Sequence, residues 1–239
     1  MDVSDPRSTD EGGLVERSMQ YLDAVRAGEP NEPRRRLEVI DPEELVALDD
    51  GERLAFWINT YNAATQDELR ADPGGFENRR RFFSTPIVTV AGTELSLDTI
   101  EHGVLRRSRW KYGLGYLPDP FPSAFVRRHR VETLDPRIHF ALNCGAAACP
   151  AIAAYEPDTV DEQLERAAGT YLRNETDVEG GTVRVPRLML WYRGDFGGGS
   201  GIRRLLREHD VIDPKTTPRI RYQEYDWSLA LDAFREEGS

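Results

Sequence analysis

The chain has 239 residues, 39% of them hydrophobic, so it is long enough for one large domain or two small ones, and we expect a single globular domain. Its 42 acidic residues outnumber the 31 basic ones, and the resulting net charge of −11 disfavours nonspecific binding to nucleic acid, which requires cationic side chains. No stretch reaches the roughly 18 to 20 apolar residues of a membrane span, and the acidic N-terminus does not resemble a secretory signal, so we expect a cytoplasmic protein without a membrane partner.

The first quarter of the chain predicts helices. We expect residues 1–12 to be a disordered tail and a first helix to run from about Gly13 to Gly28. Asp41 and Pro42 are typical of the start of a second helix, because aspartate caps helices and proline suits their first turn. A third helix, from about Glu52 to Leu69, is apolar at its centre and should lie in the core.

Polar residues on and after this core helix are candidates for a site. Asn59 and Asn62 lie three positions apart and can share a helix face, either as a structural clamp or as orienting groups. The next segment predicts a β-hairpin around Gly92, followed by a short helix that carries Glu101 and His102. A carboxylate there could orient the imidazole, although an ion-paired surface histidine is an equal alternative.

The second half of the chain predicts short elements of both kinds. Residues 109–136 predict a long loop with a helix near 123–129, and RIHFAL (137–142) predicts a strand. A helix over 159–172, a hairpin whose second arm is VRVPRLMLWYRGDF, a helix at IRRLLREH and a last strand ending in a helical turn complete the order. Helices followed by mixed elements indicate an α+β fold, with N-terminal helices on a small mixed or antiparallel sheet.

The two cysteines, Cys144 and Cys149, allow four interpretations. A stable disulfide does not suit the cytoplasm, and their C-x₄-C spacing differs from that of thioredoxin. Together with His102 and His139 they could supply four zinc ligands, but the spacing matches no common zinc motif. They could also be packing residues in a tight core, or a reactive thiol with its base.

The reactive-thiol interpretation favours Cys149. Pro150 would begin a helix with Cys149 at its N-cap, where free N–H groups and the helix dipole stabilise a thiolate. Asn143 and Gly145 could add oxyanion donors. His139 would be the base and His102 its alternate, and the orienting third member would be one of four residues, Asn59, Asn62, Asp98 and Glu101.

Several motifs in this order resemble the family called domain of unknown function 547. They are AFWINTYNA, LDTIEHGVLR, DPRIHFALNCGAAACP, YEPDTVDEQLERAAGTYL, LWYRGDFGG and YQEYDWSLA, and they span roughly residues 40 to 232. The resemblance implies that the helix with Asn59 and Asn62, the Glu101–His102 pair, His139, the cysteine loop and Asp195 form a shared pattern. Ala148 stands where other members often have serine, and the family implies no established reaction.

We therefore expect a thiol-dependent hydrolase or acyl transferase acting on a peptide-like or amide-like small substrate, without a cofactor. The alternatives are a non-enzymatic binding or scaffold domain and a zinc-stabilised domain. The predicted catalytic residues are Cys149, His139, His102, Asn59, Asn62 and Glu101, and the predicted substrate-binding residues are Trp57, Asn143, Cys144, Gly145, Trp191 and Asp195. The acidic surface, with lysine at only two of 31 basic positions, also predicts a halophilic, archaeal source.

Overall fold

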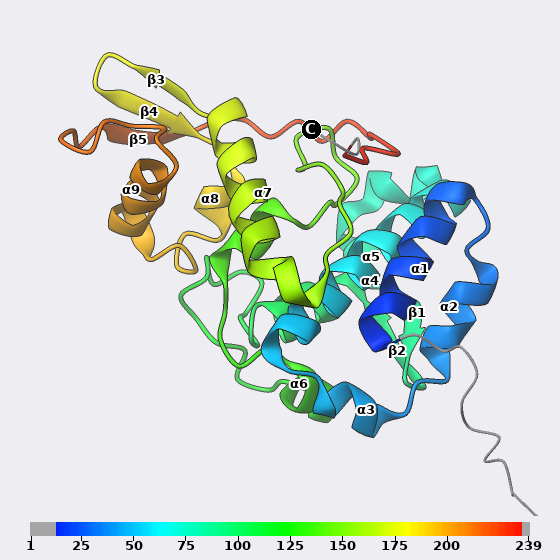
Figure 1. Cartoon of the computed structure of the whole chain (residues 1–239). Coiled ribbons are helices and arrows are strands. Elements are labelled where there is room, and N and C mark those ends of the chain that lie inside the picture. Colours follow the sequence, from blue (N-terminus) through cyan, green and yellow to red (C-terminus); the bar gives the residue numbers. More distant parts are fainter. Residues whose placement is uncertain (1–12, 236–239) are drawn as a thin grey trace, which may run out of the picture.

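The computed structural model describes residues 13–235, and the predicted tail at residues 1–12 lies outside this range. The long helix α4 (Asp50–Ala71) is the centre of the fold, and α1 (Leu14–Ala27) packs along it (Figure 1). A capping box begins α4, because the Asp49 side chain accepts the N–H of Glu52 while the Glu52 side chain accepts the N–H of Asp49. Nearly every side chain from Arg53 to Gln66 is buried, as the apolar centre of this helix predicts.

The other N-terminal elements surround α4. They are α2 (Asn31–Glu38), α3 (Pro42–Ala47), the 3₁₀ turn η1 (Pro73–Asn78), α5 (Arg79–Ser84) and the antiparallel hairpin β1 (Pro86–Val90) and β2 (Thr93–Ser96). The expected cap of α3 is present, since the Asp41 side chain accepts the N–H of Glu43. Ala91 and Gly92 both have positive φ angles in the hairpin turn, so the predicted turn at Gly92 is confirmed.

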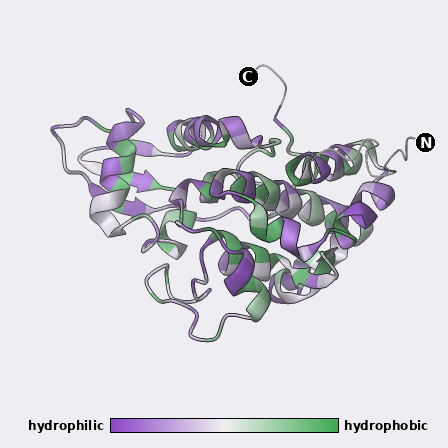
Figure 2. Cartoon of the chain, turned by 60° about the horizontal axis from the view of Figure 1, so that its bottom comes forward, coloured by the Kyte–Doolittle hydropathy of each residue, from purple (hydrophilic) through white to green (hydrophobic). Residues whose placement is uncertain are grey.

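The C-terminal elements complete the larger layer and form a second, smaller one. After the π-helical η2 (Thr99–Leu105) come α6 (Ala124–His129), the 3₁₀ turns η3 (Pro136–Phe140) and η4 (Pro157–Thr159), α7 (Val160–Asn174), β3 (Asp177–Glu179), β4 (Thr182–Val185), α8 (Leu188–Trp191), α9 (Gly198–Glu208) and β5 (Arg219–Tyr222). β4 pairs antiparallel with β3 and parallel with β5, with Val183 opposite Ile220. The sheet is largely hydrophilic at its outer edge, where β3 is fully exposed (left side of Figure 2).

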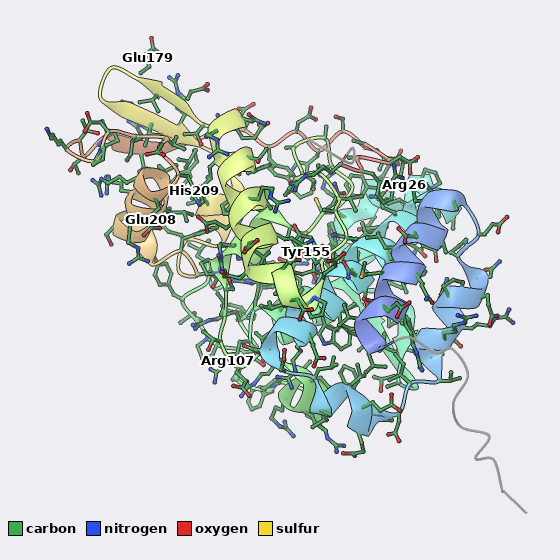
Figure 3. The ribbon with its side chains drawn as sticks, viewed as in Figure 1. Arg26, Arg107, Tyr155, Glu179, Glu208 and His209 are labelled. Atoms are coloured by element: carbon green, nitrogen blue, oxygen red, sulfur yellow. The ribbon has the colours of Figure 1, made fainter. Side chains whose placement is uncertain are left out.

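Two hydrophobic clusters correspond to these layers. The larger surrounds α4, and the smaller lies between α7, β4, α8 and α9, with Phe140 as one of its members. Charged side chains such as Glu179 and Glu208 lie at the periphery of the smaller layer (Figure 3). The α+β prediction is confirmed, and within residues 13–235 no helix is both long and apolar enough to cross a membrane.

Several local predictions are wrong. RIHFAL is not a strand, because Asp135 caps and Pro136 begins the 3₁₀ turn η3 at this point. No helix follows Pro150, so Cys149 is not an N-cap residue; Ile152 instead donates its N–H to the Ala233 carbonyl at 2.8 Å in an extended pairing. The strand expected to continue through LMLW stops at Val185, because Pro186 interrupts it, and LMLW forms α8. The helical turn expected after β5 is absent, and residues 223–235 contain no helix.

The last described residues run back across the molecule to the cysteine loop (144–149). Ala147 donates its N–H to the Ser228 carbonyl at 2.8 Å, and Ala230 donates to the Gly145 carbonyl at 2.8 Å. In Figure 1 this segment, coloured red, passes from β5 over α7 towards the side of the molecule occupied by α1 and α4. The segment 225–235 therefore forms one wall of the structure around the cysteines.

Candidate functional site

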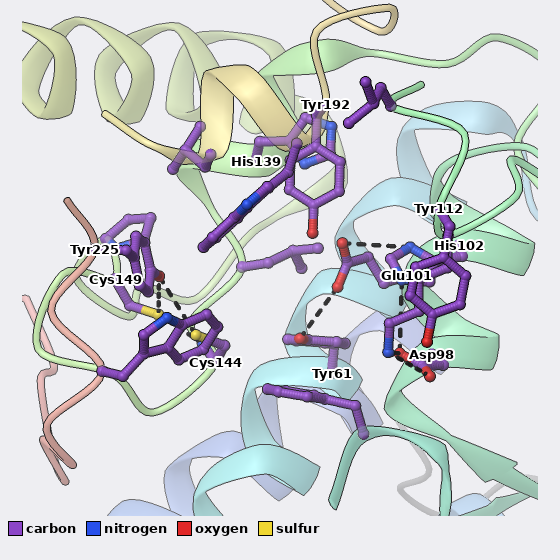
Figure 4. A pocket seen from close by; sticks show the side chains of 18 residues that line it. Tyr61, Asp98, Glu101, His102, Tyr112, His139, Cys144, Cys149, Tyr192 and Tyr225 are labelled. Carbon is purple, nitrogen blue, oxygen red and sulfur yellow. Dashed lines mark hydrogen bonds and ion pairs between the residues drawn. The ribbon is translucent and has the colours of Figure 1, made fainter. Parts of the chain in front are cut away.

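One pocket of about 380 Å³ collects the residues that the sequence singled out most strongly. Cys144 and Cys149 line it together with His102, His139 and Glu101. Figure 4 shows the thiols at one end, Glu101 with His102 at the other, and His139 between the two ends. These residues come from three segments, the turn with Glu101 and His102, the turn with His139 and the cysteine loop, and the fold brings them together as a single concave site.

Donors surround the sulfur of Cys149. The N–H of Cys144 donates to Cys149 Sγ at 3.0 Å, and the Tyr225 hydroxyl lies 3.2 Å from the same sulfur. The thiol of Cys144 also hydrogen-bonds to Cys149, and its own sulfur lies 3.5 Å from the Tyr225 hydroxyl. Both cysteines are free thiols and half-buried. Cys149 is therefore held as the acceptor of several hydrogen bonds, which favours its charged form.

The two thiols have pKa values shifted in opposite directions. Burial raises the pKa of Cys149, but hydrogen bonds from Cys144, Tyr225 and the N–H of Ala146 outweigh it, so the pKa lies below its ordinary value. The pKa of Cys144 lies well above its ordinary value because it donates to Cys149 and because it is buried. Cys149 is therefore the more acidic thiol of this pair, and Cys144 is the neighbour that keeps its proton and donates it in a hydrogen bond.

Buried amides hold the cysteine loop in place. Asn62 on α4 accepts the N–H of Asn143 at 2.8 Å and donates to the Ala141 carbonyl at 3.0 Å. Asn143 in turn accepts the N–H of Gly145 at 2.9 Å and donates to the Pro150 carbonyl at 2.8 Å. These bonds satisfy amides that have no contact with water and close the loop at both ends.

Gly145 allows the loop to approach α4. Its φ angle is +87°, and a Cβ atom there would lie 2.3 Å from Leu69 Cδ1. Only glycine fits both the left-handed backbone and this close contact. The core helix and the reactive loop are therefore in direct contact.

A buried carboxylate orients His139. His139 Nε2 lies 2.9 Å from Asp195 Oδ2, and Arg106 Nε donates to the same oxygen at 2.7 Å. The ring of His139 stacks on Tyr192 with a centroid separation of 3.8 Å. Asp195 is buried, and its pKa stays low because His139 and Arg106 outweigh the effect of burial. Stacking and hydrogen bonding together fix the position of the imidazole.

The opposite end of the pocket is built on the π-helical turn η2. Glu101 Oε1 lies 3.5 Å from His102 Nδ1, and Asp98 Oδ1 lies 3.5 Å from His102 Nε2, as the spacing of these residues suggested. The Arg106 guanidinium is 3.0 Å from His102 Nδ1, so it links His102 to Asp195. Lys111 pairs with Asp98 at 2.7 Å and balances its charge. The π-helix is rare in proteins, and its single turns are found frequently at functional sites.

Both pocket histidines are neutral near pH 7. Burial lowers the pKa of His139 below its ordinary value despite Asp195, and burial lowers the pKa of His102 despite Glu101. Glu101 remains charged, because His102, Arg106 and a hydrogen bond from Tyr192 outweigh its own burial and lower its pKa. A neutral imidazole beside a fixed carboxylate can accept a proton.

Not every predicted residue reaches the pocket. Trp191 lines it, whereas Trp57 is buried in the core between Phe56 and Phe125. Asn59 bonds both backbone groups of Tyr155 and is a structural clamp. The other predicted residues that lie behind the lining are Asn62, Asn143, Gly145 and Asp195.

The backbone N–H groups of the cysteine loop are only partly free to bind substrate. Gly145, Ala147 and Ala148 donate theirs to Asn143, Ser228 and Asp226. The N–H groups of Cys144 and Ala146 point at Cys149. The oxyanion donors expected throughout this loop are thus restricted to the two that face the sulfur.

The structure does not assemble the zinc site considered from the sequence. Among the described residues, no group of three or more histidine, cysteine, aspartate and glutamate side chains could hold a metal ion. No hydrogen bond joins Cys144 or Cys149 to either pocket histidine within residues 13–235. The cysteines and histidines share a pocket but occupy different parts of it (Figure 4).

Three functional side chains were not found from the sequence. Arg106 lies four residues after His102, and Tyr192 directly follows Trp191, so helical spacing and the LWYRGDF motif offered weak signals for them. Tyr225 lies 76 residues after Cys149, and no local pattern could relate the two.

Comparisons with known proteins identify one family. The family model described as a protein of unknown function, DUF547, matches residues 45–172. Searches of curated proteins and of solved structures return no significant match. The matched range contains both cysteines, His102 and His139, but it ends before Asp195 and Tyr225.

Proposed function

Because this chain belongs to the DUF547 family, whose function is unknown, we propose its activity from the chemistry of the pocket. The proposed function is that of a thiol-dependent hydrolase or acyl transferase with Cys149 as nucleophile. The observation that carries this proposal is the ring of donors around Cys149 Sγ, with the Cys144 N–H at 3.0 Å and the Tyr225 hydroxyl at 3.2 Å. A thiolate stabilised in an accessible pocket is the reactive form of cysteine.

The proposed reaction begins at the carbonyl carbon of an amide or ester. The Cys149 thiol loses its proton to the neutral His139, and its sulfur forms a bond to the carbonyl carbon. Since no hydrogen bond joins the thiol to this imidazole, the proton passes through a water molecule or the substrate. The C–N or C–O bond then breaks, the leaving group takes the proton, and water or an amine releases the acyl group from the sulfur.

The same donors support charge development during this reaction. As the sulfur forms its new bond it loses negative charge, which frees the N–H groups of Cys144 and Ala146 to stabilise the carbonyl oxygen. Asp195 supports the positive charge that His139 gains, in the way a third member supports a catalytic histidine.

An activated ester tests this proposal. Incubation of the full chain with p-nitrophenyl acetate should acetylate Cys149, detectable by peptide mass spectrometry, and Cys149→Ala should lose the adduct. His139→Gln should slow its hydrolysis by about 10²- to 10⁴-fold, the usual contribution of a general base. Cys144→Ala is the matched control and should still be acetylated. Equal ester turnover by wild type and Cys149→Ala would refute the proposal.

A second candidate, thiol–disulfide exchange, is favoured by the hydrogen bond between the two thiols. In this reaction the Cys149 thiolate attacks a low-molecular-weight disulfide and releases one thiol. Cys144 then displaces the second thiol, leaving an internal disulfide while two electrons pass to the reagent. With glutathione disulfide, wild type should lose two hydrogens in mass and Cys144→Ala should stop at the mixed disulfide. Two thiols that stay reduced would exclude this activity.

We also propose that the protein acts in the cytoplasm of a halophilic, archaeal cell. The acidic excess and the scarcity of lysine support this, because self-repulsion of the surface charge is screened when the surrounding salt is concentrated. Thermal unfolding should therefore move to higher temperature between dilute buffer and molar potassium chloride. A melting temperature that is highest in dilute buffer would contradict the proposal.

A further inference from the structure

A loop beside the pocket exposes an unusual number of large apolar side chains. We call residues 110–121 the apolar loop. Its exposed members are Trp110, Tyr112, Leu114, Tyr116, Leu117 and Phe121, and the Phe121 side chain is 89% exposed. Only four other large hydrophobic residues in the described part of the chain are comparably exposed, and they are scattered. Clustered exposed apolar residues mark interaction sites.

The apolar loop is ordered by its own hydrogen bonds. Trp110 donates its N–H to the Leu117 carbonyl at 2.9 Å, and Asp119 donates to the Ser108 carbonyl at 2.8 Å. Gly115, with a φ angle of +80°, packs on Asp195, so close that a Cβ atom would lie 2.6 Å from the Asp195 nitrogen. The exposed side chains therefore project from a backbone that hydrogen bonds hold in place.

The surroundings of the apolar loop are basic in an otherwise acidic protein. Residues 106–130 contain seven arginine or lysine residues and one aspartate, and three of the seven, Arg106, Lys111 and Arg128, are paired with carboxylates from outside this range. Arg107, Arg109 and Arg127 form no ion pair within residues 13–235. Arg107 lies at the edge of the molecule, where Figure 3 labels it. This charge complements an anionic partner.

We propose that the apolar loop docks on the surface of a lipid bilayer that contains anionic lipids. Aromatic and leucine side chains insert into the headgroup region, and nearby arginines meet lipid phosphates. A single-stranded nucleic acid suits the loop less well, because Leu114 and Leu117 offer no ring for base stacking. Tyr112 and Leu114 also line the pocket, so docking places the mouth of the pocket against the bilayer.

Vesicle binding tests this proposal with the full chain. Vesicles of phosphatidylcholine, alone or with about one third phosphatidylglycerol, are sedimented with the protein in about 0.1 M salt. Wild type should bind the anionic vesicles about tenfold more tightly than the neutral ones. The double variant Trp110→Ser and Phe121→Ser should lose at least about tenfold in affinity for both. In about 1 M salt, where the screening length falls from about 10 Å to about 3 Å, the preference for anionic vesicles should vanish.

Matched variants separate the two contributions. Arg107→Glu with Arg109→Glu should remove the anionic preference, whereas Arg166→Glu, on the exposed face of α7, should leave it. Val39→Ser changes an exposed apolar residue outside the apolar loop and should not affect binding. Circular dichroism verifies that each variant is folded. The proposal fails if wild type does not bind vesicles, if the Trp110 and Phe121 variant binds as wild type does, or if vesicles do not displace a single-stranded oligonucleotide bound at this loop.

Discussion

A few hydrogen-bond donors lower the pKa of Cys149. One of them, the N–H of Cys144, comes from the same loop, and another, the Tyr225 hydroxyl, comes from the C-terminal segment. The pKa of Tyr225 lies far above its ordinary value because the residue is buried and close to both thiols, so it remains a phenol that can donate. Stabilisation of the thiolate thus depends on a residue distant in the sequence.

Tyr225→Phe removes one hydrogen bond while keeping the ring. Because a hydrogen bond to a charged group contributes about 1.5–3 kcal/mol, we expect the pKa of Cys149 to rise by about one to two units. The rate of alkylation by iodoacetamide, measured against pH, reports this shift. Tyr222→Phe, at the end of β5, is the control and should leave the profile unchanged. An unshifted profile in Tyr225→Phe would show that the tyrosine does not stabilise the thiolate.

Asp195→Asn leaves the buried Arg106 guanidinium without its carboxylate. Breaking a buried pair by removing one partner costs about 3–5 kcal/mol, so the free energy of unfolding should fall by this order. Urea denaturation measures the change. Asp161→Asn, which removes an ion pair with Arg137 at a side chain that is 82% exposed, should change it by less than about 0.5 kcal/mol. Similar losses in both variants would contradict the assigned role of Asp195.

Elements whose signals are local could be predicted from the sequence. The start of the apolar helix α4 and the glycine turn of the β1–β2 hairpin are each determined by residues that lie close together in the sequence. The prediction for η3 was wrong because the alternation of apolar residues was given more weight than Asp135 and Pro136, which start a helical turn. The site was predicted in part. The motifs contain the two cysteines and the two pocket histidines, but they do not show how far apart the thiols and the imidazoles lie in the folded chain.

The apolar loop differs from the composition of the whole chain. The lack of an apolar span predicted no membrane partner, and the net charge, which is a sum over the chain, disfavoured nucleic acid. The loop concentrates apolar and basic residues within a short segment, so its local chemistry is opposite to that of the whole protein. An element can therefore have a partner that bulk composition disfavours.

Gly145→Ala tests the contact between α4 and the cysteine loop. The new Cβ atom would lie 2.3 Å from Leu69 Cδ1 in a left-handed backbone, so we expect lower stability and an altered alkylation rate of Cys149. Gly181→Ala has a similar φ angle of +77° but meets no atom within 4 Å. It should cost only the backbone strain, about 1–2 kcal/mol. Equal effects in the two variants would show that the contact with Leu69 is unimportant.

The whole molecule balances its buried charges internally. Asp195 and Glu101 are charged within the pocket region, Arg106 is the shared cation, and the neighbouring histidines are neutral. His129, outside the pocket, also has a lowered pKa because of burial and nearby arginines. Burial opposes protonation of these three histidines and outweighs the carboxylates that lie near them.

Acid should therefore destabilise the protein. The unfolded chain binds protons at His102, His129 and His139 near the ordinary pKa of 6.5, whereas the folded chain binds them only at lower pH. Below about pH 6.5 the unfolded state thus holds more protons, and the free energy of unfolding decreases as pH falls. Glu101 and Asp195, whose folded pKa values are also lowered, add a further loss at lower pH. The midpoint of urea unfolding should drop between about pH 7.5 and about pH 5.5, and a constant midpoint would contradict this.

The C-terminal segment has a consequence for synthesis of the protein. The cysteine loop leaves the ribosome long before Tyr225, and until residues 225–235 are made, Ala147, Ala148 and Gly145 lack their backbone partners. A growing chain therefore carries both thiols before residues 225–235, which form one wall of their site, have been made. The site matures only once residues 225–235 have been made, so a chain released early at β5 would hold every cysteine and histidine of the pocket and still lack the hydrogen bonds that lower the pKa of Cys149.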